Sequence, residues 1–139
     1  MTTTIATSED VREGLAAALR EIQGVQAMAY VLGSPTPPFA QVMRGPLSYH
    51  EAMGDGTSTW TMLVRVFVAN VTDIGAQKKL DEFLSVDGAR SVKAAIEADP
   101  TLGGKVADLI VTGASGEQEF VRDQGGPLLG SEWTVEVWL

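Results

Sequence analysis

One segment, residues 80–106, limits the possible folds of this chain more than any other. It reads LDEFLSVDGARSVKAAIEADPTLGGKV and predicts the end of one helix, a second short helix, a glycine-rich stop and the start of a strand. Gly88 separates the two helices and Pro100 closes the second. The abrupt helix boundaries and the lack of reactive side chains indicate a structural module rather than an enzyme.

Length and composition narrow the class of protein. A chain of 139 residues fits one domain, residues 1–139, with a sizeable core. No apolar run approaches the roughly 20 residues that cross a bilayer, and the acidic start MTTTIATSED does not resemble a signal peptide. The absence of cysteine excludes disulfides and fits a cytoplasmic origin. A net charge of −8 argues against a protein that tracks a nucleic-acid groove.

The first third of the chain predicts a helix and two strands. Thr7 or Ser8 caps the helix, whose apolar stripe comprises Val11, Leu15, Leu19 and Ile22. Residues 25–32 and 39–43 read as strands. Because residues 33–38 form a proline-rich turn, we expect the two strands to pair as a hairpin.

The strongest strand signal covers residues 60–71. Both of its faces are mostly apolar, so we expect a central strand covered on both sides, in which Arg65 needs a partner. A helix follows from Thr72 to Leu84, with Ile74, Gln77, Leu80 and Leu84 near one face.

Two more strands and two long loops complete the chain. Residues 106–112 predict a strand, and residues 131–139 alternate between an inward apolar set and an outward polar set. Residues 45–59 and 113–130 are glycine-rich loops. The expected fold class is α+β, with one mainly antiparallel mixed sheet of about five strands, an N-terminal helix and a central helix pair.

The sequence offers no convincing catalytic, cofactor or metal site. His50 is the only histidine and reads as an exposed loop residue. Residues 103–105 (Gly-Gly-Lys) lack the Ser or Thr that follows the lysine of a phosphate loop. Residues 113–116 miss the nucleophile elbow because Glu117 replaces its second flanking glycine. The acids Asp81, Glu82 and Asp87 read as a solvated helix face.

Two aromatic residues are candidates for contact with a neighbouring subunit. Trp138 interrupts the polar face of the last strand, opposite the inward Trp133, and fraying of the chain end is the alternative reading. Tyr49 lies in the first long loop and is the second candidate.

In the order and spacing of its residues, the chain resembles the tail terminator proteins of long-tailed (siphovirus-type) bacteriophages. The resemblance covers nearly the whole length and rests on Pro37-Pro38-Phe39, Pro46, Tyr49 and Trp60, then on residues 76–106 and the ending 130–137. It implies a virion protein without enzymatic activity or cofactor, assembled in the host cytoplasm. Such a protein forms a ring, a hexamer in this family, at the head-proximal end of the tail. The ring stops polymerisation of the tail tube protein and joins the tail to the head–tail connector protein.

A ring of this kind would surround the genomic DNA, which passes through without specific binding. An acidic lining repels phosphate over about 8 Å at physiological salt. We therefore expect Glu51 and Asp55 near the lumen, together with some of Glu117, Glu119 and Asp123. The basic residues Arg12, Arg20, Lys78 and Lys79 are expected outside or at ring–ring contacts. Solubility alone is the alternative explanation of the acids.

Two other functions stay open at this point. Another head–tail joining protein or a tail tube protein would share a small α+β fold and ring symmetry. A small-ligand binding protein or enzyme would instead place a pocket under residues 45–59.

Overall fold

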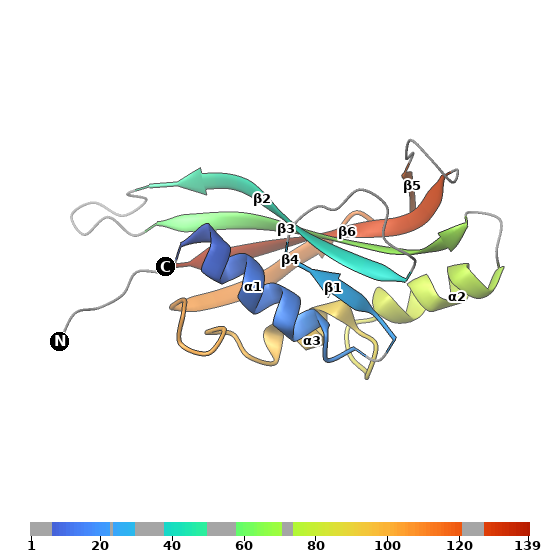
Figure 1. Cartoon of the computed structure of the whole chain (residues 1–139), viewed down its shortest axis with the longest axis horizontal. Helices are drawn as coiled ribbons and strands as arrows, with labels where there is room; N and C mark the ends of the chain where they lie inside the picture. Colours follow the sequence, from blue (N-terminus) through green and yellow to red (C-terminus); the bar gives the residue numbers. More distant parts are fainter. Residues whose placement is uncertain (1–6, 23, 30–37, 50–57, 71–73, 121–126) are drawn as a thin grey trace.

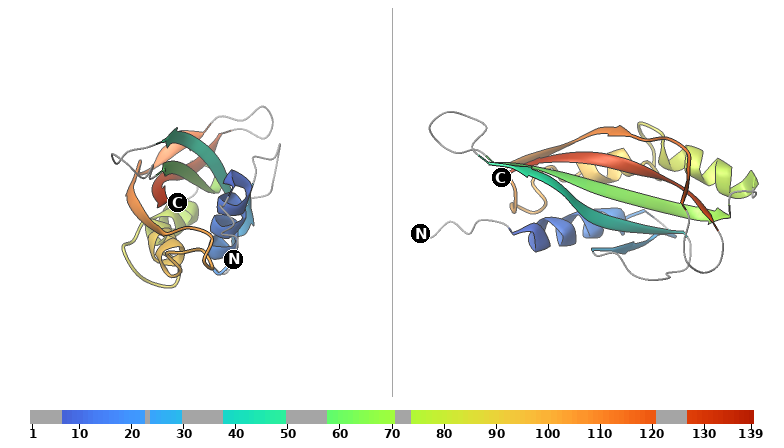
Figure 2. Two further views of the ribbon diagram at one scale, coloured as in Figure 1. Left: turned by 90° about the vertical axis from the view of Figure 1, so that its left-hand side faces the viewer. Right: turned by 90° about the horizontal axis from the view of Figure 1, so that it is seen from above.

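A computed structural model of the chain describes residues 7–22, 24–29, 38–49, 58–70, 74–120 and 127–139. It is a small single domain in which three helices lie against one face of a mixed sheet (Figures 1 and 2). This confirms the predicted α+β class. In chain order the elements are α1 (Ser8–Leu19), β1 (Gln26–Met28), β2 (Phe39–Ser48), β3 (Thr59–Asn70), α2 (Ile74–Phe83), α3 (Val92–Glu97), β4 (Asp108–Ala114), β5 (Gln118–Phe120) and β6 (Leu128–Trp138).

The sheet has the strand order β1-β2-β3-β6-β4, and the short β5 also pairs with β6. β3 is therefore central, as predicted, with antiparallel neighbours β2 and β6. β4 and β5 pair with successive stretches of β6, so they act as one interrupted strand. No helix in the described residues is long and apolar enough to cross a membrane.

The predicted hairpin of the first two strands is wrong, because β1 pairs with β2 in parallel. Ala27 lies opposite Ala40, and the Gln26 N–H donates to the Pro38 carbonyl at 3.3 Å. The local pattern identified extended chain but carried no information on direction. Contacts with α1 favour the observed direction of β1, since Nε of Arg20, the C-cap residue of that helix, donates to the Ala27 carbonyl of β1 at 3.2 Å. Most of the predicted turn lies outside the described residues.

Helix α1 begins as its sequence predicts. Thr7 is the N-cap, and its hydroxyl accepts the Asp10 N–H while the Asp10 carboxylate accepts the Thr7 N–H. This reciprocal pair satisfies two donors that a helix start leaves free. The predicted apolar stripe is buried throughout: Val11, Leu15, Leu19 and Ile22.

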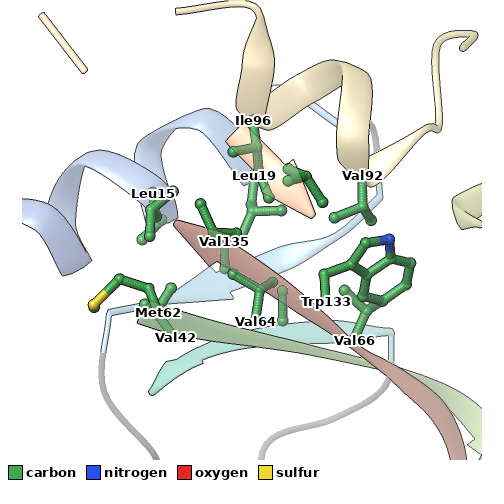
Figure 3. Close-up of a cluster of buried hydrophobic side chains, with 14 of the residues drawn as sticks. Leu15, Leu19, Val42, Met62, Val64, Val66, Val92, Ile96, Trp133 and Val135 are labelled. Atoms are coloured by element: carbon green, nitrogen blue, oxygen red, sulfur yellow. The ribbon is translucent and has the colours of Figure 1, made fainter. Parts of the chain in front are cut away.

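The main core lies between this helix layer and the sheet. Figure 3 shows Leu15 and Leu19 of α1 and Ile96 of α3 above the side chains of Val64 and Val135. Val64 and Val135 have no exposed surface, and Trp133, which the alternation of β6 placed inward, is 2% exposed. The strict alternation of β6 thus reports which face of the sheet meets the helices.

Helix α2 buries only part of the predicted stripe: Leu80 is buried and Leu84 packs against the core, as expected. Ile74 is 68% exposed, whereas Ala76, Leu80 and Phe83 are buried. These three positions have the i, i+4, i+7 spacing of a single helical stripe. Ile74, two residues before Ala76, points away from that stripe because successive residues turn by about 100°.

Both predicted loops are shorter than expected. β2 runs to Ser48 and β3 starts at Thr59, so residues 45–48 belong to a strand. The signal was misread because Gly45 and Pro46 mark a bulge in the β2–β3 register. A Cβ on Gly45 would lie 2.4 Å from the Thr61 carbonyl oxygen, which explains the glycine. The second loop, residues 113–130, contains β5 and the ends of β4 and β6.

Candidate assembly surfaces

Among the described residues no helix lies on the second face of the sheet, contrary to the expected cover on both sides of β3 (Figure 2). Near the end of β3 this face has its own small buried cluster of Phe39, Phe67 and Leu128, with Met28 and Phe120 packed against it. Towards the other end, Met43 and Leu63 are half-buried neighbours and Ile110 is 45% exposed. We call this side, formed by alternate residues of β2, β3, β6 and β4, the uncovered face.

Arg65, the charged residue in an apolar strand, finds its partner on the uncovered face. Its Nε donates to Glu132 Oε2 at 2.7 Å, and the two residues are direct neighbours in the β3–β6 register. The guanidinium carbon also lies 5.2 Å from the centre of the Phe120 ring. An ion pair and a cation–π contact thus hold the arginine flat against the sheet.

The uncovered face carries more described acids than described bases. By register, the uncovered face carries Asp108, Glu132 and Glu136, and its only described base is Arg65. The basic residues of the helices lie elsewhere: Arg12 donates to the Ala29 carbonyl, Arg20 donates to the Ala27 carbonyl of β1, and Lys78 and Lys79 are exposed on α2.

The two aromatic contact candidates lie at the same end of the sheet. Tyr49 follows Ser48, which pairs with Thr59, and Thr59 pairs on its other side with Trp138. Tyr49 is 67% exposed, whereas Trp138 is half-buried and shares the uncovered face with Glu136. The structure therefore brings together two residues that are far apart in the sequence.

Glu117 and Glu119 lie beyond β4, in the corner leading to β5 and in β5 itself, and both are exposed. β5 pairs with the start of β6, so these acids are at the opposite end of the sheet from Trp138. The other proposed lumen residues, Glu51, Asp55 and Asp123, fall outside the described residues, as does His50.

The remaining sequence candidates have structural contacts. Ser115 Oγ accepts the Glu132 N–H at 3.0 Å and lies 3.2 Å from the Gly116 carbonyl, so it stabilises the corner between β4 and β5. Gly103 has a φ of +72°, and its N–H donates to Asp99 at 2.8 Å, which makes residues 99–104 a turn. Within the described ranges, no group of three or more His, Cys, Asp or Glu side chains is placed to hold a metal ion.

Two features gave no signal in the sequence. One is a hollow of about 430 Å³ between α1 and α3, whose lining combines small residues such as Gly14, Ala17 and Ala95 with larger ones such as Glu21 and Lys105. The other is Glu97, which reaches from α3 to the backbone of β4, where its Oε2 accepts the Val111 N–H at 3.0 Å. Alanines and a lone acid in a short helix are too common to predict either contact.

The pKa of Glu97 reflects this position. The hydrogen bond from Lys93 lowers the pKa below its usual 4.5, and the Val111 N–H lowers it further. Partial burial opposes the shift because it disfavours the charged form. The carboxylate is thus held in its charged state by two donors.

No protein-family model matches the chain, and no curated protein is significantly similar to it in sequence.

Proposed function

We propose that this protein is a structural subunit of a bacteriophage virion, a ring-forming tail terminator at the head-proximal end of the tail. The observation that favours it most is the pairing of a one-sided sheet with two aromatic contact candidates, Tyr49 and Trp138, at a single sheet end. The residue order that resembles tail terminators, densest in residues 76–106, supports the same function.

The proposed mechanism is geometric. In a closed ring each subunit contacts its neighbour through two different surfaces, because a head-to-tail interface is heterologous. The aromatic end of the sheet is one such surface, since Tyr49 presents a large side chain that water surrounds in the free subunit. One side of the ring would match the last ring of the tail tube, and the other side would accept the head connector instead of another tube subunit.

The distribution of exposed acidic side chains is consistent with the passage of DNA through the proposed ring. On the uncovered face Asp108 and Glu136 have no neighbouring base in the register, whereas Glu132 is paired with Arg65. A lumen built from acids would not form the salt-dependent phosphate contacts that slow DNA. Glu117 and Glu119 are exposed, as this proposal requires.

A tail tube protein is the main alternative, and electron microscopy of the purified protein separates the two. A terminator should give monomers or single rings at every concentration, because it does not present the surface for a following ring. Filaments that lengthen with concentration would identify a tube protein instead.

Alanine variants test the contact surface directly. Tyr49→Ala and Trp138→Ala should each weaken ring formation, measured by sedimentation velocity, and thermal unfolding should show that the fold persists. Val86→Ala is the matched control, because Val86 is 75% exposed but follows α2, away from the aromatic end. Equal assembly of all three variants and the parent chain would argue against this surface.

A further inference from the structure

β4 is an edge strand of the sheet, and within the described structure its outer edge pairs with no other strand. Its sequence, Asp-Leu-Ile-Val-Thr-Gly-Ala, is rich in β-forming residues, has one charge and contains no proline. Segments with these properties pair readily with copies of themselves when their edge is free. Ile110, in the middle of the strand, is 45% exposed. β4 therefore needs protection against self-association.

Side-chain carboxylates occupy two backbone donors of this strand. The Val111 N–H donates to Glu97 Oε2 at 3.0 Å, and the Leu109 N–H donates to Asp108 Oδ1 at 2.9 Å. Asp108 belongs to β4 itself, whereas Glu97 comes from the preceding helix α3. A strand that added to β4 would need the Val111 donor for its own ladder and would have to displace Glu97.

A second ion holds the Glu97 carboxylate in place. Lys93, one turn earlier in α3, donates to Glu97 Oε1 and leaves Oε2 for β4. Charge-assisted hydrogen bonds of this kind are about twice as strong as neutral ones. The side chains of Lys93 and Glu97 are 39% and 25% exposed, so the contact lies at the surface, where an incoming strand would arrive.

We infer that Glu97 blocks the β4 edge against antiparallel pairing with β4 of a second copy of this chain. A second copy is the fitting partner because two identical edges related by a two-fold axis are self-complementary. Antiparallel pairing would place Asp108 of one copy opposite Ala114 of the other. The two Asp108 carboxylates would then lie at opposite ends of the pair and would not face each other. The block concerns the backbone edge of β4, whereas the proposed ring contact concerns the side chains of Tyr49 and Trp138. The two surfaces adjoin, because Asp108 pairs with Trp138.

Glu97→Ala tests the inference. This variant frees the Val111 donor and should produce an additional species of twice the parent mass, measured by sedimentation velocity over a range of concentrations. Glu82→Ala is the matched control: Glu82 forms an ion pair with Arg90 at 3.3 Å on the exposed surface and does not contact β4. The control should sediment like the parent chain.

A crosslink identifies the edge that pairs. The chain has no cysteine, so Ile110→Cys introduces a single reporter in β4. In the register that places Asp108 opposite Ala114, the two copies of residue 110 are diagonal neighbours, about 7–8 Å apart and too far for a direct disulfide. A short bis-maleimide reagent spans this distance, and with it Glu97→Ala/Ile110→Cys should form a covalent dimer, whereas Ile110→Cys alone should not. Hydrogen exchange of the Val111 amide at low concentration, where copies are separate, should be about tenfold faster or more in Glu97→Ala, given a charge-assisted hydrogen bond.

Three results would overturn the inference. They are an unchanged mass for folded Glu97→Ala, equal crosslinking with and without that substitution, or an equal mass increase in Glu82→Ala. If Glu97→Ala does not fold, Lys93→Met provides a second test. This variant keeps the Glu97 carboxylate and removes only the cation that positions the carboxylate. Lys93→Met should raise the crosslinking of Ile110→Cys, and crosslinking at the level of Ile110→Cys alone would then reject the block.

Discussion

Arg65 in β3 and Glu132 in β6 form an ion pair of 2.7 Å across the centre of the uncovered face. Their side chains are 34% and 24% exposed, so the pair is neither fully solvated nor dry. The Arg65 guanidinium also lies against the Phe120 ring, which belongs to the separate cluster on this face. Arg65 therefore joins the two central strands to β5.

The Arg65–Glu132 pair should contribute measurably to stability. Because the side chains are 34% and 24% exposed, solvent screening reduces the coupling to about 1 kcal/mol. A double-mutant cycle with Arg65→Ala and Glu132→Ala, followed by urea unfolding, measures this coupling. Arg65→Ala should cost more than Glu132→Ala, since it also loses the ring contact. A coupling of zero would mean that the pair has no energetic role.

Two glycines of the β4–β6 region should respond differently to alanine. A Cβ on Gly130 would lie 2.4 Å from the Val66 carbonyl oxygen, so the strands must separate to accept it. Gly130→Ala should therefore lower the free energy of unfolding by about 1–3 kcal/mol. Gly113 has nothing within 4 Å of its virtual Cβ. Gly113→Ala should thus be neutral or slightly stabilising in the same denaturant experiment. Equal effects would contradict the close approach at Gly130.

The buried face of α2 can be tested with two large apolar residues of the same helix. Leu80 is 1% exposed, so Leu80→Ala should cost about 2–5 kcal/mol, as expected for a cavity in a packed core. Ile74 is 68% exposed, and Ile74→Ala should change stability by less than about 0.5 kcal/mol. Thermal unfolding of the two variants shows which substitution lowers the stability more. The opposite order would restore the helix face expected from the sequence.

The sequence predicted the elements whose signals are local. The cap at Thr7, the stripe of α1 and the alternation of β6 depend on residues within a few positions of each other, and all three are confirmed. The central place of β3 also followed from its own apolar run. The direction of β1 did not, because pairing with β2 depends on contacts with α1 that no local pattern encodes.

The candidate surfaces were less predictable for the same reason. Tyr49 and Trp138 were identified separately as exposed aromatic candidates, but their shared sheet end follows from the β2–β3–β6 register. The prediction that both faces of β3 are covered was wrong for the uncovered face. There Phe67 is buried by other aromatic side chains rather than by a helix. A hydrophobic pattern reports that a face is buried and not what buries it.

The contact of Glu97 with Lys93 and Val111 should make stability depend on pH. Its pKa in the folded chain lies below 4.5, chiefly because of Lys93. A carboxylate with a lowered pKa stabilises the fold above its unfolded pKa, and this contribution is lost as the pH falls through the folded value. Urea unfolding of the parent chain and Glu97→Gln should therefore differ most at neutral pH, and the difference should shrink below a pH of about 4.5.

Lys93→Met distinguishes the two donors that act on this carboxylate. Without the ammonium group, only the Val111 N–H lowers the pKa of Glu97, and partial burial raises it. The pH at which the Glu97 contribution disappears should therefore move upward in Lys93→Met, as measured by the same unfolding series. If that pH does not move, the cation is not what keeps Glu97 charged, and the backbone of β4 alone must hold the carboxylate.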